Sequence, residues 1–142
     1  MERVKIYLSG AMTGVSFEDQ TKWRNKIANA IKYGGYDYTK TPIFFDPTKY
    51  YVPSETFHKS EKEAMNFDLY NLRNSNLMIV NFNSPSSIGT AMELMLAKEL
   101  KIPVIGINSN NEDIHSWLLE CVDRMCDDIR EVVEYTVEYF LN

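Results

Sequence analysis

The sequence predicts an α/β fold: a single-domain, three-layer sandwich with a parallel sheet of four to five strands flanked by helices. The first observation is that short apolar runs alternate with segments of helical periodicity along the whole chain. The second is that 142 residues with 44% hydrophobic content suit one compact domain. No repeat or low-complexity tract divides the chain, so residues 1–142 are expected to form one domain.

The first half of the chain predicts three strands and two helices. Residues 4–8 are rich in β-branched and aromatic side chains and predict the first strand. Residues 18–33 have apolar side chains near helical spacing and end at Gly34 and Gly35, which predicts a helix. Residues 42–47 predict a short strand, 48–57 a loop and 59–73 a second helix. The continuous apolar run at residues 77–80 predicts a central buried strand.

The second half predicts two more helices in the same alternation, joined by a weaker helical segment. Residues 88–100 predict a third helix, and residues 102–107 a fourth strand. The third helix is expected to bury Met92, Met95, Leu96 and Leu100. A helical stripe over residues 114–122 follows, with Asp113 as its expected N-cap. A short fifth strand is expected at residues 124–126. Asp128 and Glu131 have capping-box spacing for a last helix at 129–141. The resulting architecture is of the Rossmann and flavodoxin-like type.

Composition and charge narrow the function classes. The formal net charge of −5 argues against a nucleic-acid polymer or a membrane surface as partner, because both are polyanionic. No apolar run approaches the length of a membrane span, and no signal peptide is visible, so a cytoplasmic location is expected. Cys121 is expected in the core, and both it and Cys126 as reduced thiols. Their spacing, with two histidines in the chain, predicts no metal site.

Polar residues gather in the loops that follow the first, third and fourth predicted strands, at residues 9–14, 81–90 and 108–113. In a parallel sheet, ligands bind at the carboxyl ends of the strands. The segment from Ser86 to Glu93 runs from a strand end into a helix start, where hydroxyls and free N–H groups favour an anion. By local pattern alone, the simpler interpretation is structural: Ser87 is an N-cap, and Glu93 is a carboxylate that interacts favourably with the helix dipole.

Two further side chains change that interpretation when they are taken with Glu93. Asp68 lies on the helix that leads into the central strand, and Tyr7 lies at the end of the first strand. Glycosidic chemistry needs one carboxylate at the sugar and a second group that protonates the leaving base. A tyrosine hydroxyl can orient such a carboxylate. In isolation, Asp68 would be interpreted as a solvated helix residue and Tyr7 as a strand aromatic.

Taken together, three segments resemble the nucleoside 2-deoxyribosyltransferase superfamily. Residues 5–10 resemble its opening strand and glycine turn. Asp68 with Leu69, followed by residues 74–80, resembles its passage from helix to strand. The pattern Ser-x-Gly-Thr-x-x-Glu from Ser87 to Glu93 resembles its nucleophile segment.

The resemblance implies a role for each site residue. Glu93 would attack C1′ and form a glycosyl-enzyme intermediate, Tyr7 would orient Glu93, and Asp68 would contact the base and assist its departure. No cofactor is implied. A homodimer or a higher homo-oligomer is implied, in which Ser116 would reach the neighbouring site. The substrate-binding residues expected are Ser9, Gly10, Met12, Thr13, Gly14, Ser87, Gly89, Thr90 and Ser116.

Ser87 decides which branch of the superfamily is expected. Its pattern is similar to the nucleoside 5′-monophosphate N-glycosidases, which implies hydrolysis of a 2′-deoxynucleoside 5′-monophosphate to free base and deoxyribose 5-phosphate. Those enzymes often have an arginine in the first loop, where this chain has Met12, Thr13 and Gly14. Base exchange between deoxynucleosides is the alternative, and a non-catalytic nucleotide-binding module is a third. In each case the partner is a small deoxynucleotide or deoxynucleoside, and the base is left open.

Overall fold

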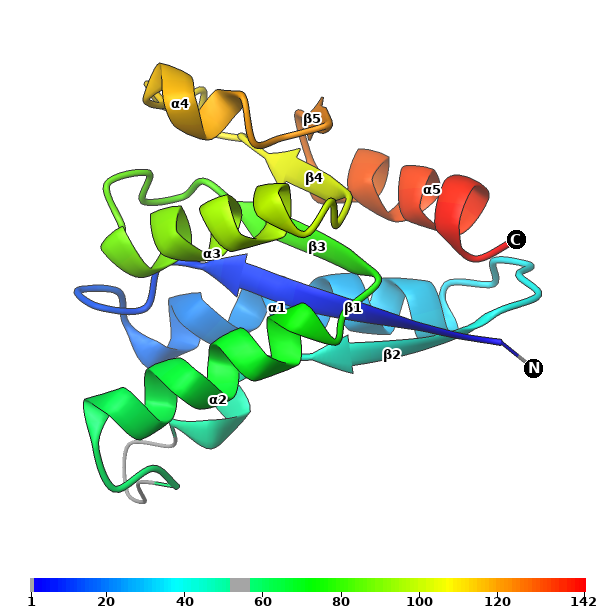
Figure 1. Cartoon of the computed structure of the whole chain (residues 1–142). Coiled ribbons are helices and arrows are strands. Elements are labelled where there is room, and N and C mark those ends of the chain that lie inside the picture. The colour runs from blue at the N-terminus through cyan, green and yellow to red at the C-terminus, as the bar shows by residue number, and fades with distance from the viewer. Residues whose placement is uncertain (1, 52–56) are drawn as a thin grey trace.

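A computed structural model describes residues 2–51 and 57–142, and these form one five-stranded parallel sheet with helices on both faces (Figure 1). The strand order is β2-β1-β3-β4-β5, and every neighbouring pair is parallel. In chain order the elements are β1 (Arg3–Gly10), α1 (Phe17–Tyr33), β2 (Thr41–Phe45), η1 (Pro47–Tyr50), α2 (Glu61–Arg73), β3 (Leu77–Asn81), α3 (Ile88–Glu99), β4 (Val104–Ile107), α4 (Ser116–Leu119), β5 (Arg124–Cys126) and α5 (Ile129–Phe140). The predicted fold class is confirmed, including the short fifth strand.

The two faces of the sheet carry separate cores because side chains alternate along each strand. On β1, Ile6 and Leu8 pack with α1 and α5, whereas Tyr7 packs with α2 and α3. The central strand β3 is buried on both faces, as its continuous apolar run predicted. Since Ser9 shares the face of Tyr7, both side chains point to the side of the sheet that α2 and α3 cover.

Gly10 ends β1 on the opposite face, and its missing side chain has a packing reason. A Cβ there would lie 2.8 Å from Cζ2 of Trp23, which is the aromatic anchor of α1. The next residue, Arg24, donates from Nε to the Leu8 carbonyl at 3.1 Å and from a terminal nitrogen to the Gly10 carbonyl at 3.0 Å. Trp23 and Arg24 therefore fix the end of β1, from which the first polar loop departs.

Two predicted features of the helices are wrong. The helical stripe at residues 114–122 forms only the single turn of α4, capped by His115 and not by Asp113. Asp123 already pairs with Val104 through its backbone N–H and its carboxylate, so the chain must leave the helix to enter β5. On α3, the buried side chains are Thr90, Leu94 and Ala97, whereas Met92, Met95 and Leu100 are exposed. The small residues let α3 approach the sheet closely, and the longer ones are left at the surface.

The remaining predictions of the fold are met in part. The N-cap of α5 is confirmed, because the Glu131 N–H donates to Asp128 at 2.8 Å. The Glu131 carboxylate accepts from the Asp127 N–H at 3.0 Å, one residue before the N–H that a capping box uses. Cys126 is fully buried and Cys121 only half-buried, the reverse of the expectation for a core Cys121. The loop expected at 48–57 begins as η1, and its residues 52–56 lie outside the described part. No helix in the described ranges is long and apolar enough to cross a membrane.

Candidate active site

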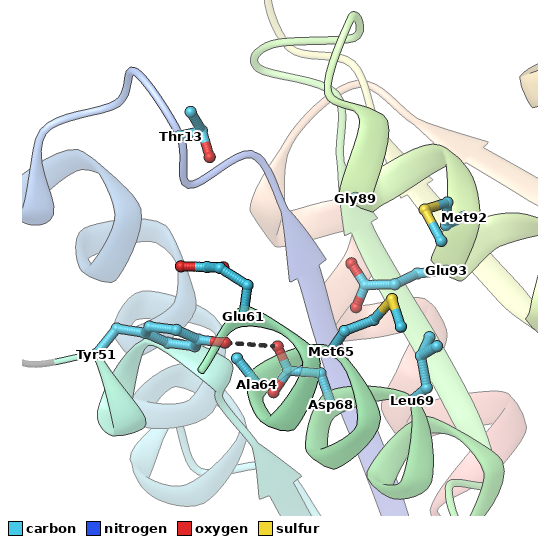
Figure 2. Close-up of a pocket in the computed structure, with 10 residues that line it drawn as sticks. All are labelled: Thr13, Tyr51, Glu61, Ala64, Met65, Asp68, Leu69, Gly89, Met92 and Glu93. Atoms are coloured by element: carbon cyan, nitrogen blue, oxygen red, sulfur yellow. Dashed lines mark hydrogen bonds between the residues drawn. The ribbon is translucent and has the colours of Figure 1, made fainter. Parts of the chain in front are cut away.

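Two adjoining pockets open at the carboxyl edge of the sheet, on the side covered by α2 and α3. The first, here called the acidic pocket, is a cavity of about 250 Å³ (Figure 2). Its described lining is Thr13, Tyr51, Glu61, Ala64, Met65, Asp68, Leu69, Gly89, Met92 and Glu93. The second, here called the hydroxyl pocket, has about 340 Å³ and is lined by Gly10, Met12, Thr13, Ser84, Ser86, Ser87, Ile88, Gly89, Thr90 and Glu93. Thr13, Gly89 and Glu93 belong to both, so Glu93 stands where the two pockets meet.

The Glu93 side chain points from α3 into the space between α3, β1 and α2 (Figure 2). The pKa of its carboxyl group is raised from 4.5 to about 7, mainly by burial and also by the neighbouring charge of Asp68. The Ser9 hydroxyl donates a hydrogen bond of 3.3 Å to Glu93 Oε1 and opposes that rise. At neutral pH the group is therefore poised between its acid and its carboxylate, as a nucleophile or proton-transfer group requires.

Tyr7 lies beneath Glu93 and is completely buried. Burial and the charges of Glu93 and Asp68 raise the pKa of its phenol well above the usual value, so the hydroxyl keeps its proton. This hydroxyl favours the carboxylate form of Glu93, but it completes no hydrogen bond with any described residue. Hydrogen bonds of this kind are often long before a ligand binds. The phenol is thus a donor available to Glu93.

Asp68 approaches the acidic pocket from α2. Its carboxyl group is half-buried, and burial is the main reason that its pKa is raised from 3.8 to about 6. The Tyr51 hydroxyl donates to Asp68 Oδ2 at 3.4 Å (Figure 2). This hydrogen bond and the charge of Arg24 oppose the rise in the pKa. The other oxygen, Oδ1, is buried and has no partner within the described ranges. Two carboxyl groups with raised pKa values therefore face one cavity, an arrangement that suits acid–base and nucleophilic chemistry near neutral pH.

The hydroxyl pocket lies at the N-terminus of α3. Ser87 caps this helix by accepting a hydrogen bond from the Thr90 N–H at 3.3 Å. The first turn of a twelve-residue helix leaves N–H groups without intrahelical acceptors and has a positive partial charge. Serine hydroxyls at positions 84, 86 and 87 surround that turn. The pocket therefore offers donors to an anion, without a cationic side chain among its described lining residues.

Most of the residues expected in the site line these pockets or contact Glu93, but two do not. Gly14 has a φ of +79° and turns the first loop without lining either pocket. Ser116 begins α4, is exposed, and also lies outside both pockets. Ile88, Ser84 and Ser86 line the hydroxyl pocket without having been expected there.

The sequence analysis also missed several residues of the acidic pocket. Glu61, Ala64 and Met65 precede Asp68 by seven, four and three residues, so helical spacing could have found them. Tyr51 follows η1 and carried no comparable signal, because its neighbours are equally aromatic. In the described residues, no group of three histidine, cysteine, aspartate or glutamate side chains is arranged to hold a metal ion.

Solved structures with this fold are similar over almost the whole chain. A 2-deoxyribosyltransferase from Bacillus psychrosaccharolyticus has a TM-score of 0.69 and 18% identity, covering 93% of this chain and 92% of that one. A 2-deoxyribosyltransferase from Leishmania mexicana has a TM-score of 0.66 and 17% identity, covering 97% and 99%. A CMP N-glycosidase from Clostridium botulinum has a TM-score of 0.58 and 13% identity, covering 96% and 99%. At these identities the similarity establishes the shared fold.

Sequence comparison gives the family. No curated protein matches the chain. Residues 4–106 match the family described as "Domain of unknown function (DUF4406)", and this range contains every described residue that lines the two pockets. The match covers well over half of the sequence, so the chain belongs to the DUF4406 family.

Proposed function

We propose that this protein cleaves the N-glycosidic bond of a 2′-deoxynucleoside 5′-monophosphate and releases the free base and deoxyribose 5-phosphate. The observation that carries the proposal is the place of Glu93. Its carboxyl group, with a pKa of about 7, stands between a pocket of carboxylates and a pocket of hydroxyls at a helix N-terminus. A deoxynucleotide has the matching order of parts: a base, a sugar carbon to be attacked and a phosphate.

In the first step, the ionised Glu93 attacks C1′ of the sugar and forms a glycosyl ester. The C1′–N bond breaks, its electron pair goes to the base nitrogen, and protonated Asp68 supplies the proton that neutralises the departing base. Tyr7 donates to Glu93 and, with Ser9, holds the attacking carboxylate in place. In the second step, water attacks C1′, Asp68 accepts its proton, and deoxyribose 5-phosphate leaves while Glu93 regains its carboxylate.

In this proposal the phosphate occupies the hydroxyl pocket. Ser87, Gly89 and Thr90 begin α3, where backbone N–H groups and the helix dipole favour an anion. Gly10, Met12 and Thr13 form the opposite wall. None of the described residues that line this pocket is an arginine, so binding relies on neutral donors and is expected to be weaker than at a cationic phosphate site.

Base exchange is the second candidate, because two of the solved structures that share this fold are 2-deoxyribosyltransferases. It differs from hydrolysis only in the group that attacks the glycosyl ester. A product assay decides between them: deoxynucleosides and their 5′-monophosphates are incubated with the protein, with and without a second free base. Base release from a monophosphate without an acceptor supports hydrolysis, whereas rapid formation of a new nucleoside supports exchange. Ligand binding with no cleavage of any substrate would contradict both and leave a binding module.

We also propose that two copies of the chain associate and that Ser116 acts in the neighbouring site. Ser116 lies outside the pockets of its own chain, on a helix that packs on α3. The surface of α3 and α4 exposes Met92, Met95 and Trp117, the last at 79%, which is apolar area that an interface would cover. Sedimentation velocity should show a dimer, and Ser116→Ala should lower activity without changing the assembly. A monomer with full activity would contradict this arrangement.

A further inference from the structure

The acidic pocket contains one continuous stripe of α2. Its members are Glu61, Ala64, Met65, Asp68 and Leu69, whose spacing places them on one face of the helix. Glu61 and Asp68 supply the two carboxylates of this stripe, and the apolar side chains of Ala64 and Met65 lie between them. With a rise of 1.5 Å per residue, Glu61 and Asp68 are separated by roughly 10 Å along the helix axis. The stripe thus has the length and polarity of a site for a flat molecule with an apolar face.

The remaining walls of the acidic pocket fit the same shape. Met92 comes from α3 and Tyr51 from the end of η1, so the cavity lies between two helices and an aromatic ring (Figure 2). Methionine side chains adapt to a planar ring and contact it favourably. These walls give affinity for a ring without selecting one base over another, so selection falls to the polar groups.

Those polar groups are nearly all hydrogen-bond acceptors. Glu61, Asp68 and Glu93 bring three carboxyl groups to the pocket, and no lysine, arginine, asparagine or glutamine is among its described lining residues. The Tyr51 hydroxyl, one of two hydroxyl donors in the lining, is occupied by Asp68 Oδ2. Burial raises the pKa of the Tyr51 phenol most, and the charges of Asp68, Glu61 and Glu93 raise it further. A ligand that offers donors therefore fits, and one that offers carbonyl oxygens meets other acceptors.

A buried polar atom without a partner marks the pocket as a place for a ligand. Asp68 Oδ1 is buried and makes no hydrogen bond with any described residue. Leaving such an atom unsatisfied is unfavourable, and a bound molecule would satisfy it. In the proposed function Asp68 acts on the bond to the base, so Glu61 is the carboxylate left to contact the far edge of the ring.

We propose that the acidic pocket receives a nucleobase with an exocyclic amino group, and that Glu61 accepts a hydrogen bond from this group while Tyr51 positions Asp68. This proposal rests on the proposed function for the placement of the sugar at Glu93. Glu61 is a specificity residue in it, because it contacts the base far from the bond that breaks. An oxo group at the same place would direct its lone pairs at the Glu61 carboxylate, and the site would reject it.

The test uses two pairs of substrates in which an oxo group replaces the amino group and the adjacent ring nitrogen gains a proton: deoxyadenylate against deoxyinosinate, and deoxycytidylate against deoxyuridylate. In each pair the wild-type protein should prefer the amino member by about tenfold or more in kcat/KM, the scale of one hydrogen bond to a charged group. Glu61→Gln should lower this ratio at least about fivefold, because an amide can turn to accept or to donate. Glu138→Gln, an exposed carboxylate on α5 outside both pockets, is the matched control and should keep the ratio.

A second measurement separates this proposal from the proposed function. The dissociation constants of the same four nucleotides are measured by calorimetry, with the wild-type protein and with Glu61→Gln. If no substrate is cleaved, the proposed function fails, but a preference for amino bases that Glu61→Gln removes still supports the specificity role. Equal affinity for both members of each pair, a preference for the oxo members, or a ratio that Glu61→Gln leaves unchanged would each overturn it.

Discussion

The acidic pocket and the hydroxyl pocket lie side by side and share Glu93, yet they are built in opposite ways. The acidic pocket takes its polar groups from α2 and from Tyr51, as side-chain carboxylates among methionines and a phenol. The hydroxyl pocket takes them from the start of α3, as hydroxyls and backbone N–H groups. The first surrounds a region where positive charge is stabilised, and the second a region where negative charge is stabilised. This separation is what a reaction with a cationic sugar in its transition state and an anionic phosphate requires.

The largest effect is expected from the residue that the two pockets share. Glu93→Gln removes the nucleophile while keeping its size, so the rate of base release should fall by at least about a thousandfold. Nucleotide binding should change little, because the rest of both pockets remains. Glu99→Gln, an exposed carboxylate on the same helix, is the control and should keep full activity. A Glu93→Gln protein that retains more than a tenth of the wild-type rate would rule out a nucleophilic Glu93.

A smaller effect is expected when the hydroxyl pocket alone is altered. Ser87→Ala should lower the preference for a 5′-monophosphate over its nucleoside by about tenfold in kcat/KM, since a donor to the phosphate is lost. Ser87 also caps α3, so Ser16→Ala, which removes the corresponding cap of α1 outside both pockets, controls for lost helix stability. If the two variants change the preference equally, Ser87 has no part in binding phosphate.

The raised pKa of Glu93 predicts that the stability of the folded protein changes with pH. Because the pKa of Glu93 in the folded protein is about 7, raised above its unfolded value, the folded state holds a proton that the unfolded state releases earlier. Stability is therefore lost as the pH rises from about 4.5 to about 7, and the loss is complete above that range. Glu93→Gln removes this effect and should stabilise the protein at pH 8 by up to about 3 kcal/mol, with little change at pH 4. Thermal melts at both pH values measure this, and an equal shift at both would refute it.

The smallest effect is expected from Tyr51→Phe. The Tyr51 hydroxyl lowers the pKa of Asp68, so its removal should move that pKa upward from about 6. Since Asp68 must be protonated to assist the departing base, the alkaline limb of the pH profile should move to higher pH by less than about one unit. A variant that lost activity equally at every pH would indicate a role for Tyr51 in packing alone.

The parts of the fold and of the site that local sequence pattern determines could be predicted from the sequence. The parts that long-range packing determines could not. Four of the five strands were predictable because each is a short apolar run between turn signals, whereas β5, with the sequence Arg-Met-Cys, gave only a weak signal. The order of the strands brought Tyr7, Asp68 and Glu93 to one edge of the sheet. The sequence could not predict which face of α3 is buried, because Met92 and Met95 are as apolar as Leu94. Only the close approach of the sheet at Thr90 and Ala97 decides which side is buried.

Tyr51 and Glu61, two site residues that the sequence analysis missed, were missed for the same reason. Tyr51 is one of several aromatic residues near η1, and only the folded chain brings its hydroxyl to Asp68, seventeen residues away. Glu61 lies at the start of a helix, where a carboxylate is favoured for its own sake by the helix dipole. In both cases a local explanation was sufficient, so the sequence offered no reason to look for a second one.

The most direct test of the account is to trap the sugar on Glu93. A nucleotide with fluorine at C2′ of the sugar destabilises the cationic transition states of both steps, and a good leaving base restores the first step, so the glycosyl ester accumulates. Intact-mass measurement should then show the protein plus one fluorinated deoxyribose 5-phosphate, and peptide mapping should place it on Glu93. Base release without any adduct, or an adduct on another residue, would contradict the central claim that Glu93 attacks the sugar.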